Sequence, residues 1–217
     1  MGKLVNKLLL VTVLFGQTLS VCAQGPRSHP LAVGIEGAAY RWASSPAQPR
    51  FQALSGAFFR YVPERLGVRV RAAFNRRTEG ANTGNCADCL GGETAYRTFT
   101  LRIGGQYTAL PKVPWLYGFL DVAYRKTSAN GRYTGGFCGC LDYTGTQTKH
   151  SLGAMVGVGA SFQIIPRVFL GPELYYEGFV GRTASLTTDN RSGQQTAHGE
   201  RSTEHAPAIR VQAALTF

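Results

Sequence analysis

Hydrophobic and polar residues alternate with a period of two in eight stretches of this chain. Successive side chains of a β-strand point to opposite faces, so the alternation predicts strands with one apolar and one polar face. The clearest stretch contains the run Val68, Arg69, Val70, Arg71. The eight predicted strands cover about 31–41, 51–62, 67–77, 95–108, 115–126, 150–164, 168–180 and 207–217.

The connections between these strands are alternately short and long. The short ones, at 63–66, 109–114 and 165–167, contain prolines suited to turns. The long ones are polar and lie at about 42–50, 78–94, 127–149 and 181–206. Transmembrane barrels have short turns on one side and long loops on the other, so we expect an even number of strands with both termini on the short-turn side. The last connection, rich in Thr, Ser, Gln, Asn and Gly, is predicted to be a mobile surface segment.

The first residues predict export. Lys3 and Lys7 precede an apolar run, and Val21-Cys22-Ala23 offers a small-residue end for cleavage. We therefore predict a signal peptide over 1–23 and one barrel domain over 24–217. Lipid attachment at Cys22 stays open, because Leu19-Ser20-Val21-Cys22 roughly resembles a lipoprotein signal. After Gln24 no apolar run approaches the roughly 18 residues of a membrane helix, so a membrane-spanning chain would have to be a closed barrel.

The chain is basic, with a net charge of +11, which falls to +9 when Lys3 and Lys7 leave with the signal peptide. A basic balance can indicate nucleic-acid binding. An exported protein rarely meets nucleic acid, and the arginines here lie within alternating strands rather than in one cluster. We therefore expect no nucleic-acid partner, and lipid phosphates or internal ion pairs as the anions that these cations meet.

The polar faces of the predicted strands carry charges that would line a lumen. An eight-stranded barrel has room inside only for its own side chains, and buried charges persist only when they are paired. We predict a plug of ion pairs, with a narrow ion path of anion preference as the alternative. The predicted network consists of Glu36, Arg60, Arg69, Arg71, Arg102, Asp121, Arg125, Glu173, Glu177 and Arg210.

Four cysteines remain after the predicted cleavage: Cys86 and Cys89 in one long connection, Cys138 and Cys140 in the next. An exported protein meets an oxidising environment, which favours disulfides, here between the two connections. A four-thiolate zinc site is the alternative, although the spacing of Cys138 and Cys140 is tight for it. We expect no metal site and no cofactor.

The signal peptide, the eight amphipathic strands and the terminal Leu215-Thr216-Phe217 together resemble the small OmpA/OmpX-like outer-membrane β-barrel proteins of Gram-negative bacteria. The resemblance covers about 31–217, as a pattern rather than as an identity motif. It implies an all-β, eight-stranded antiparallel up-and-down transmembrane barrel in the bacterial outer membrane, monomeric, with a structural or surface-interaction role.

The resemblance also implies partners. In that family the last strand is the signal read by the barrel-assembly machinery, and Ile209, Val211, Leu215 and Phe217 match it. Outer-membrane lipids, lipopolysaccharide and an extracellular ligand bound through the loops are the other expected partners.

Two alternatives remain. A soluble β-sandwich also shows alternating strands. Some eight-stranded barrels modify lipid A with a His and a Ser at one rim, and His150-Ser151 stands at the start of a predicted strand. Adjacent strand residues point to opposite faces, which separates a nucleophile from its base, so we expect no enzymatic activity.

Overall fold

The computed structural model describes residues 30–42, 49–52, 55–82, 91–110, 113–135 and 141–217. These residues form strands and turns, and they contain no helix long and apolar enough to cross a membrane. The strands are β1 (Leu31–Trp42), β2 (Pro49–Gln52), β3 (Ser55–Tyr61), β4 (Leu66–Asn82), β5 (Gly91–Tyr107), β6 (Leu116–Gly135), β7 (Leu141–Ala160), β8 (Phe162–Ile165), β9 (Val168–Asp189) and β10 (Gln195–Thr216).

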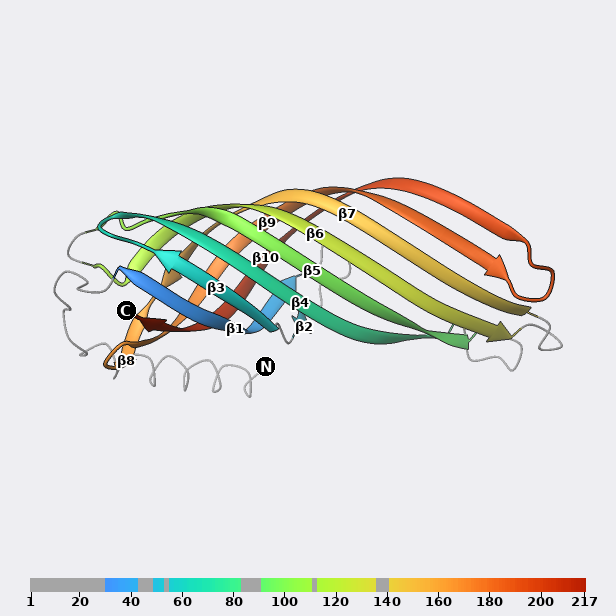
Figure 1. Cartoon of the computed structure of the whole chain (residues 1–217), viewed down its shortest axis with the longest axis horizontal. Helices are drawn as coiled ribbons and strands as arrows, with labels where there is room; N and C mark the ends of the chain where they lie inside the picture. Colours follow the sequence, from blue (N-terminus) through green and yellow to red (C-terminus); the bar gives the residue numbers. More distant parts are fainter. Residues whose placement is uncertain (1–29, 43–48, 53–54, 83–90, 111–112, 136–140) are drawn as a thin grey trace, which may run out of the picture.

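Eight of these strands form a closed antiparallel ring in the order β1, β3, β4, β5, β6, β7, β9, β10 (Figure 1). The last strand, β10, pairs with β9 on one side and with β1 on the other, which closes the sheet. The two short strands continue ring strands: β8 extends the pairing of β7 with β9 in the same register, and β2 pairs with β1 beyond β3 with a one-residue shift. The predicted up-and-down architecture is therefore confirmed for the described residues.

Backbone hydrogen bonds gather the short turns and both ends of the described chain at one end of the barrel. Phe217 donates its N–H to the carbonyl of Leu31, and Thr216 donates to Arg167 in the turn between β8 and β9. Val62 likewise donates to Pro30. The structure thus places both termini of the described chain at the short-turn end, as the connection lengths indicated.

Three of the four predicted long connections turn out to be mostly strand. The prediction of a mobile segment at 181–206 is wrong. Strands β9 and β10 pair in continuous register, from Val168 opposite Leu215 up to Thr188 opposite Gln195. The connections at 78–94 and 127–149 are likewise shortened by extensions of β4, β5, β6 and β7. The pattern of alternating apolar residues ends before the strands do, because the strand segments beyond the apolar belt have water on their outer face. The backbone pairing of these segments continues without outward apolar residues.

Two predicted strands are interrupted. The stretch 51–62 contains the end of β2 and all of β3, which both pair with β1 but differ in register by one residue. The stretch 150–164 is divided at Ser161 between β7 and β8. The register of β1 against β10 also shifts between Glu36 and Ala38, which marks a β-bulge. A period-two pattern does not reveal such short breaks, because apolar residues resume on both sides of them.

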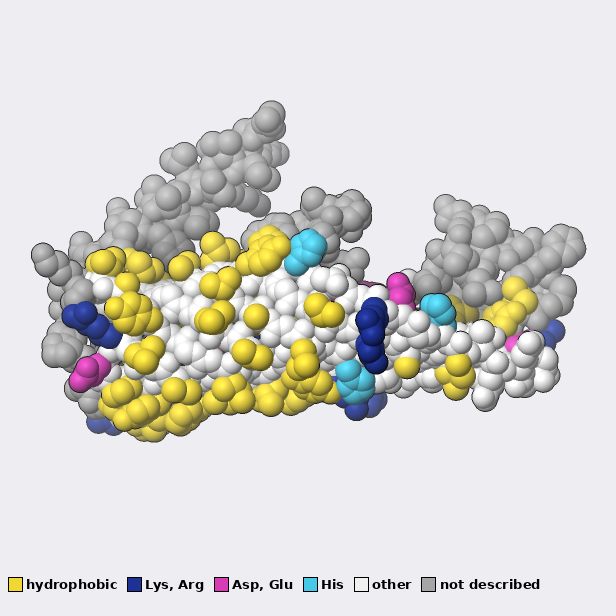
Figure 2. Space-filling model, turned by 90° about the horizontal axis from the view of Figure 1, so that it is seen from above, with side chains coloured by type: hydrophobic (Ala, Val, Ile, Leu, Met, Phe, Trp, Pro, Cys, Tyr) yellow, Lys and Arg dark blue, Asp and Glu magenta, His cyan; other side chains and the backbone are white. Residues whose placement is uncertain are grey.

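The outer face of the ring is apolar over the short-turn half of the strands. On β4 this belt runs from Leu66 to Phe74, nine residues, as a tilted membrane strand requires. Its side chains stay exposed, for example Val122 at 64% and Leu152 at 66%. Figure 2 shows hydrophobic side chains over this part of the surface and fewer of them beyond it. An apolar surface of this extent is stable in contact with hydrocarbon rather than water.

Inward glycines on β7 make room for aromatic side chains from neighbouring strands. A Cβ added to Gly159 would lie 2.5 Å from Cζ and 2.6 Å from the hydroxyl of Tyr117. We predict that Gly159→Ala lowers the free energy of unfolding by about 1–3 kcal/mol, because the ring is fully enclosed and has to move. Urea unfolding of the refolded barrel in detergent measures the loss. The control is Gly178→Ala, since nothing lies within 4 Å of a Cβ there; equal losses in both variants would contradict the prediction.

The far ends of β6, β7 and β9 are joined by an exposed polar cluster. Arg132 donates from Nη2 to Asp142 at 2.7 Å, and the side-chain amide of Asn190 donates to Asp142 at the same distance. The hydrogen bond from Arg132, followed by that from Asn190, lowers the pKa of the Asp142 carboxyl from 3.8 to about 2. The folded state therefore holds this carboxylate ionised over a pH range in which the unfolded chain is protonated.

This cluster gives a pH prediction. A depressed pKa stabilises the fold above the unfolded pKa and loses that contribution as the pH falls from about 4 to about 2. The carboxyl carbon of Asp142, followed by NMR, should titrate near pH 2, and Arg132→Gln should move that titration toward 3.8. An unchanged titration in the Arg132 variant would show that the ion pair is absent in solution.

Candidate functional site

The lumen is occupied by a charged cluster centred on Glu173 of β9. Its carboxylate is fully buried and accepts hydrogen bonds from the three guanidinium groups of Arg69, Arg71 and Arg210 at 2.9, 2.7 and 2.6 Å. The hydroxyl of Tyr117 donates to the same carboxylate at 2.7 Å. These four donors come from β4, β6 and β10, so one carboxylate joins strands on opposite sides of the ring.

A second carboxylate, Glu36 of β1, shares Arg71 and Arg210 with Glu173 and also meets Arg102. Its Oε1 lies 2.6 Å from Arg71, 3.4 Å from Arg210 and 3.5 Å from Arg102. On β6, Asp121 lies 2.8 Å from Nε of Arg69. Because every one of these guanidinium groups meets a carboxylate, the lumen can hold several buried charges without leaving one uncompensated.

Aromatic rings fill the space between the guanidinium planes. Arg69 lies over Phe119 at 3.8 Å, and Arg210 lies over Tyr175 at 4.6 Å. Such contacts satisfy the faces of a guanidinium group that hydrogen bonds in its plane leave open. Charged groups and rings together therefore pack this part of the lumen.

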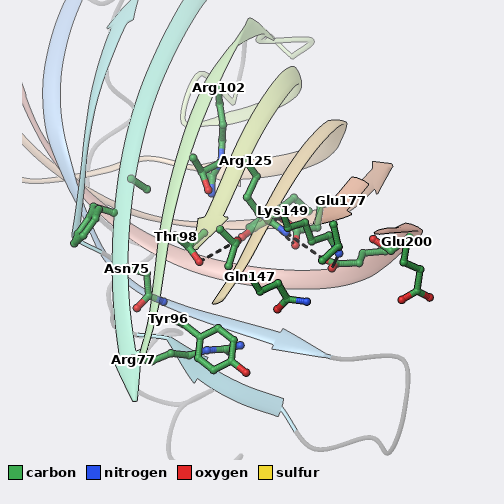
Figure 3. A pocket seen from close by; sticks show the side chains of 18 residues that line it. Asn75, Arg77, Tyr96, Thr98, Arg102, Arg125, Gln147, Lys149, Glu177 and Glu200 are labelled. Carbon is green, nitrogen blue, oxygen red and sulfur yellow. Dashed lines mark hydrogen bonds and ion pairs between the residues drawn. The ribbon is translucent and has the colours of Figure 1, made fainter. Parts of the chain in front are cut away.

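A polar cavity of about 390 Å³ lies above this cluster, on the side of the long hairpins (Figure 3). Arg102 and Tyr175 belong to both the cluster and the cavity lining. Arg125 pairs there with Glu177 at 3.1 Å and with Glu204 at 3.5 Å, and Lys149 pairs with Glu204. The remaining lining is mostly hydroxyl and amide groups: Asn75, Tyr96, Thr98, Thr100, Thr127, Gln147, Thr183 and Ser202. We call this cavity the vestibule.

The ten residues predicted for the lumen all lie on the inner side of the ring. Arg60 packs over the ring of Tyr117, with 5.6 Å between the guanidinium carbon and the ring centre. Arg125 and Glu177 form the upper pair of the cluster, and Arg125 is the most exposed of the ten at 15%. Sequence reasoning missed the apolar part of the filling: Phe58, Phe119, Met155 and Phe179 are buried at inward positions. The inward phase of each strand was the signal that could have revealed them.

Other predicted residues are placed differently. Ile209, Val211, Leu215 and Phe217 lie on the outward phase of β10 and its end, and their role as an assembly signal stays a prediction. The predicted signal peptide with Cys22, and Cys86, Cys89, Cys138 and Cys140, lie outside the described residues, so the disulfide prediction stays a prediction.

His150 and Ser151 point to opposite sides of the barrel wall. His150 is exposed and its Nδ1 lies 2.8 Å from the hydroxyl of Tyr124, whereas Ser151 is buried at 3% exposure. A hydrogen bond between the two side chains is therefore not formed. Within the described ranges no group of three His, Cys, Asp or Glu residues is arranged to hold a metal ion.

Comparison with known proteins gives the class of the fold. No family model matches the chain, and no curated protein matches it. A solved structure of a major outer membrane protein from Thermus thermophilus is similar, with a TM-score of 0.56 and 16% identity over 87% of this chain and 100% of that one. Neisserial surface protein A gives a TM-score of 0.44 with 16% identity, over 89% of this chain and 100% of that one.

The closed ring, its apolar outer belt and the likeness to the Thermus protein give this chain the fold of a small outer-membrane β-barrel. At this level of identity the likeness concerns the fold. The features that bear on function are therefore the charged filling of the lumen and the long hairpins.

We predict that removing the charge of Glu173 lowers the free energy of unfolding more than removing any other charge of the cluster. Glu173→Gln keeps the shape but leaves three guanidinium groups facing a neutral amide, so the free energy of unfolding should fall by about 3–5 kcal/mol. Urea unfolding in detergent, followed by the mobility shift of the folded barrel on gels, measures the loss. The matched control is Glu200→Gln, an exposed carboxylate of the vestibule, where we expect less than about 1 kcal/mol. A loss at Glu173 no larger than that of the control would mean that the cluster does not stabilise the barrel.

Proposed function

We propose that this protein is a closed membrane scaffold that presents its long hairpins outside the cell as a surface for interaction, and that it does not conduct solutes. The ion-paired filling of the lumen carries the proposal. Glu173, Arg69, Arg71 and Arg210 are each at most 1% exposed, and they are joined across the ring by hydrogen bonds. Moving an ion through would require these bonds to break in a low-dielectric interior.

The length of the strands supports the proposal that the long hairpins form a surface for interaction. The continuous outward apolar run of β9 ends at Val180, and farther out only Ala184 and Leu186 are apolar on that face, but β9 and β10 stay paired up to Thr188 and Gln195. At about 3.4 Å per residue, this hairpin continues for roughly 25 Å beyond the belt. Figure 1 shows β6, β7, β9 and β10 extending together away from the short-turn end. A paired extension of this length presents fixed side chains, in contrast to a mobile loop.

The rival function is a narrow ion channel, and the vestibule is the observation that favours it. It forms an entrance lined by both signs of charge, with Arg125 and Lys149 opposite Glu177 and Glu204. The filling below it argues for the scaffold.

Conductance in a planar bilayer separates the two functions. We expect no current steps from the wild-type barrel after insertion, because the filled lumen offers no aqueous path. A general porin inserted in the same bilayer serves as the positive control. Discrete current steps that scale with the amount of inserted wild-type protein would overturn the closed-scaffold proposal in favour of the channel.

Epitope insertion tests the outward placement of the hairpins. An epitope after Gly193, in the turn between β9 and β10, should be stained by antibody on intact cells. The same epitope after Glu64, in the short turn between β3 and β4, should be stained only after the outer membrane is permeabilised. The reverse pattern would place the hairpins in the periplasm.

A further inference from the structure

A ring of cationic and histidine side chains follows the outer end of the apolar belt. On each of six successive ring strands, the outward residue directly above the end of the belt's uninterrupted run of nonpolar outward residues is basic or histidine. The pairs are Phe74 and Arg76 on β4, Phe99 and Arg97 on β5, Tyr124 and Lys126 on β6, Leu152 and His150 on β7, Val180 and Arg182 on β9, and Pro207 and His205 on β10. Figure 2 shows Lys, Arg and His side chains gathered where the hydrophobic side chains end.

Three residues of this ring and Arg201, which lies farther out on β10, form a continuous row across the strands. Lys126 stands opposite His150, His150 opposite Arg182, and Arg182 opposite Arg201. All four are exposed on the outward phase. With neighbouring strands about 4.8 Å apart, the row is only about 15 Å long. We call these four residues the basic row.

Without a bound anion, the electrostatic energy of the basic row is unfavourable. Like charges directly opposite on adjacent strands repel each other. None of the four side chains forms an ion pair with a carboxylate among the described residues, because Glu177, Glu200 and Glu204 at this level line the vestibule instead. The outward carboxylates Glu93 and Asp142 lie further along β5 and β7, and Asp142 is paired with Arg132. An anion bound from outside would remove this repulsion.

The position of the row specifies which anion fits. Lys126, His150 and Arg182 lie directly above side chains that face hydrocarbon, at the depth where the headgroups of the outer leaflet begin, and Arg201 stands beside Arg182. A neighbouring aromatic also holds the His150 ring, through the Tyr124 hydroxyl 2.8 Å from Nδ1. Guanidinium groups bind phosphate oxygens through paired hydrogen bonds, and a row of several cations suits a headgroup that carries more than one phosphate.

We infer that Lys126, His150, Arg182 and Arg201 form a binding site for the phosphate groups of an outer-leaflet lipid. In an outer membrane this lipid is lipopolysaccharide. The inference rests on the outward placement of the hairpins proposed above, but not on a closed lumen. Conductance would therefore overturn the scaffold proposal without affecting the lipid site, and a failure of lipid binding would leave the closed lumen in place.

The test compares two variants that each remove two positive charges. Arg182→Gln with Arg201→Gln neutralises half of the basic row, and Arg65→Gln with Arg167→Gln neutralises two exposed arginines at the short-turn end. The refolded barrels are titrated in neutral detergent with purified lipopolysaccharide and with its dephosphorylated form. Bound lipid is counted by native mass spectrometry.

We expect the phosphorylated lipid to bind wild type and the short-turn control equally, and the row variant at least roughly tenfold more weakly, as the loss of a charge-assisted hydrogen bond implies. Equal binding by the two double variants would overturn the inference, as would equal binding of the dephosphorylated lipid. Competition by inorganic phosphate at concentrations matching the lipid would show that a free anion, not a lipid, is the ligand.

A second measurement separates a binding role from a structural one. Without lipid, the row variant should be at least as stable to heating as wild type, because the substitution relieves repulsion between cations. Added lipopolysaccharide should then raise the unfolding temperature of wild type by several degrees more than that of the variant. If the variant does not refold, Lys126→Gln with Arg182→Gln replaces it, with the same expectations. A variant that is less stable without lipid and equally stabilised by it would make the row structural.

Discussion

Hydrocarbon cannot hydrogen-bond to a peptide group, and this constraint governs the rest of the structure. Every strand within the membrane must find a partner on both sides, which forces the sheet to close through the pairing of β10 with β1. A ring of eight strands has a narrow interior, so the inward side chains must fill it. Outward side chains meet lipid and are apolar. The two faces of each strand therefore follow from a single requirement on the backbone.

The charged filling is the second consequence. Glu173 and Glu36 share Arg71 and Arg210, so the inward charges form one connected network rather than separate pairs. Such a network ties β1, β4, β9 and β10 together from inside, in addition to the hydrogen bonds of the sheet. The aromatic rings of Phe119 and Tyr175 exclude water from it, which strengthens each charged contact and makes an unpaired charge costly.

Charge on this barrel is sorted by depth and by face. Within the belt the charged residues face the lumen, where they are paired. At the outer end of the belt the cations of the basic row turn outward, while the acidic Glu177, Glu200 and Glu204 stay at the vestibule. The excess positive charge of the chain is thus concentrated, among the described residues, where the phosphates of a lipid leaflet would lie.

The sequence alone determined the ring and its two faces. An apolar belt outside and a polar lumen inside require side chains that alternate with a period of two, as in the run from Val68 to Arg71. It also determined which arginines and acids face inward. Only the tertiary structure decided which of them meet, since Glu173 and Arg69 are far apart in the chain and are brought together by strand tilt and register. The extension of β9 and β10 beyond Val180 could likewise not be predicted from the sequence, because strands surrounded by water need no apolar face. The basic row emerged last, since Lys126, His150, Arg182 and Arg201 become neighbours only through the pairing of four strands.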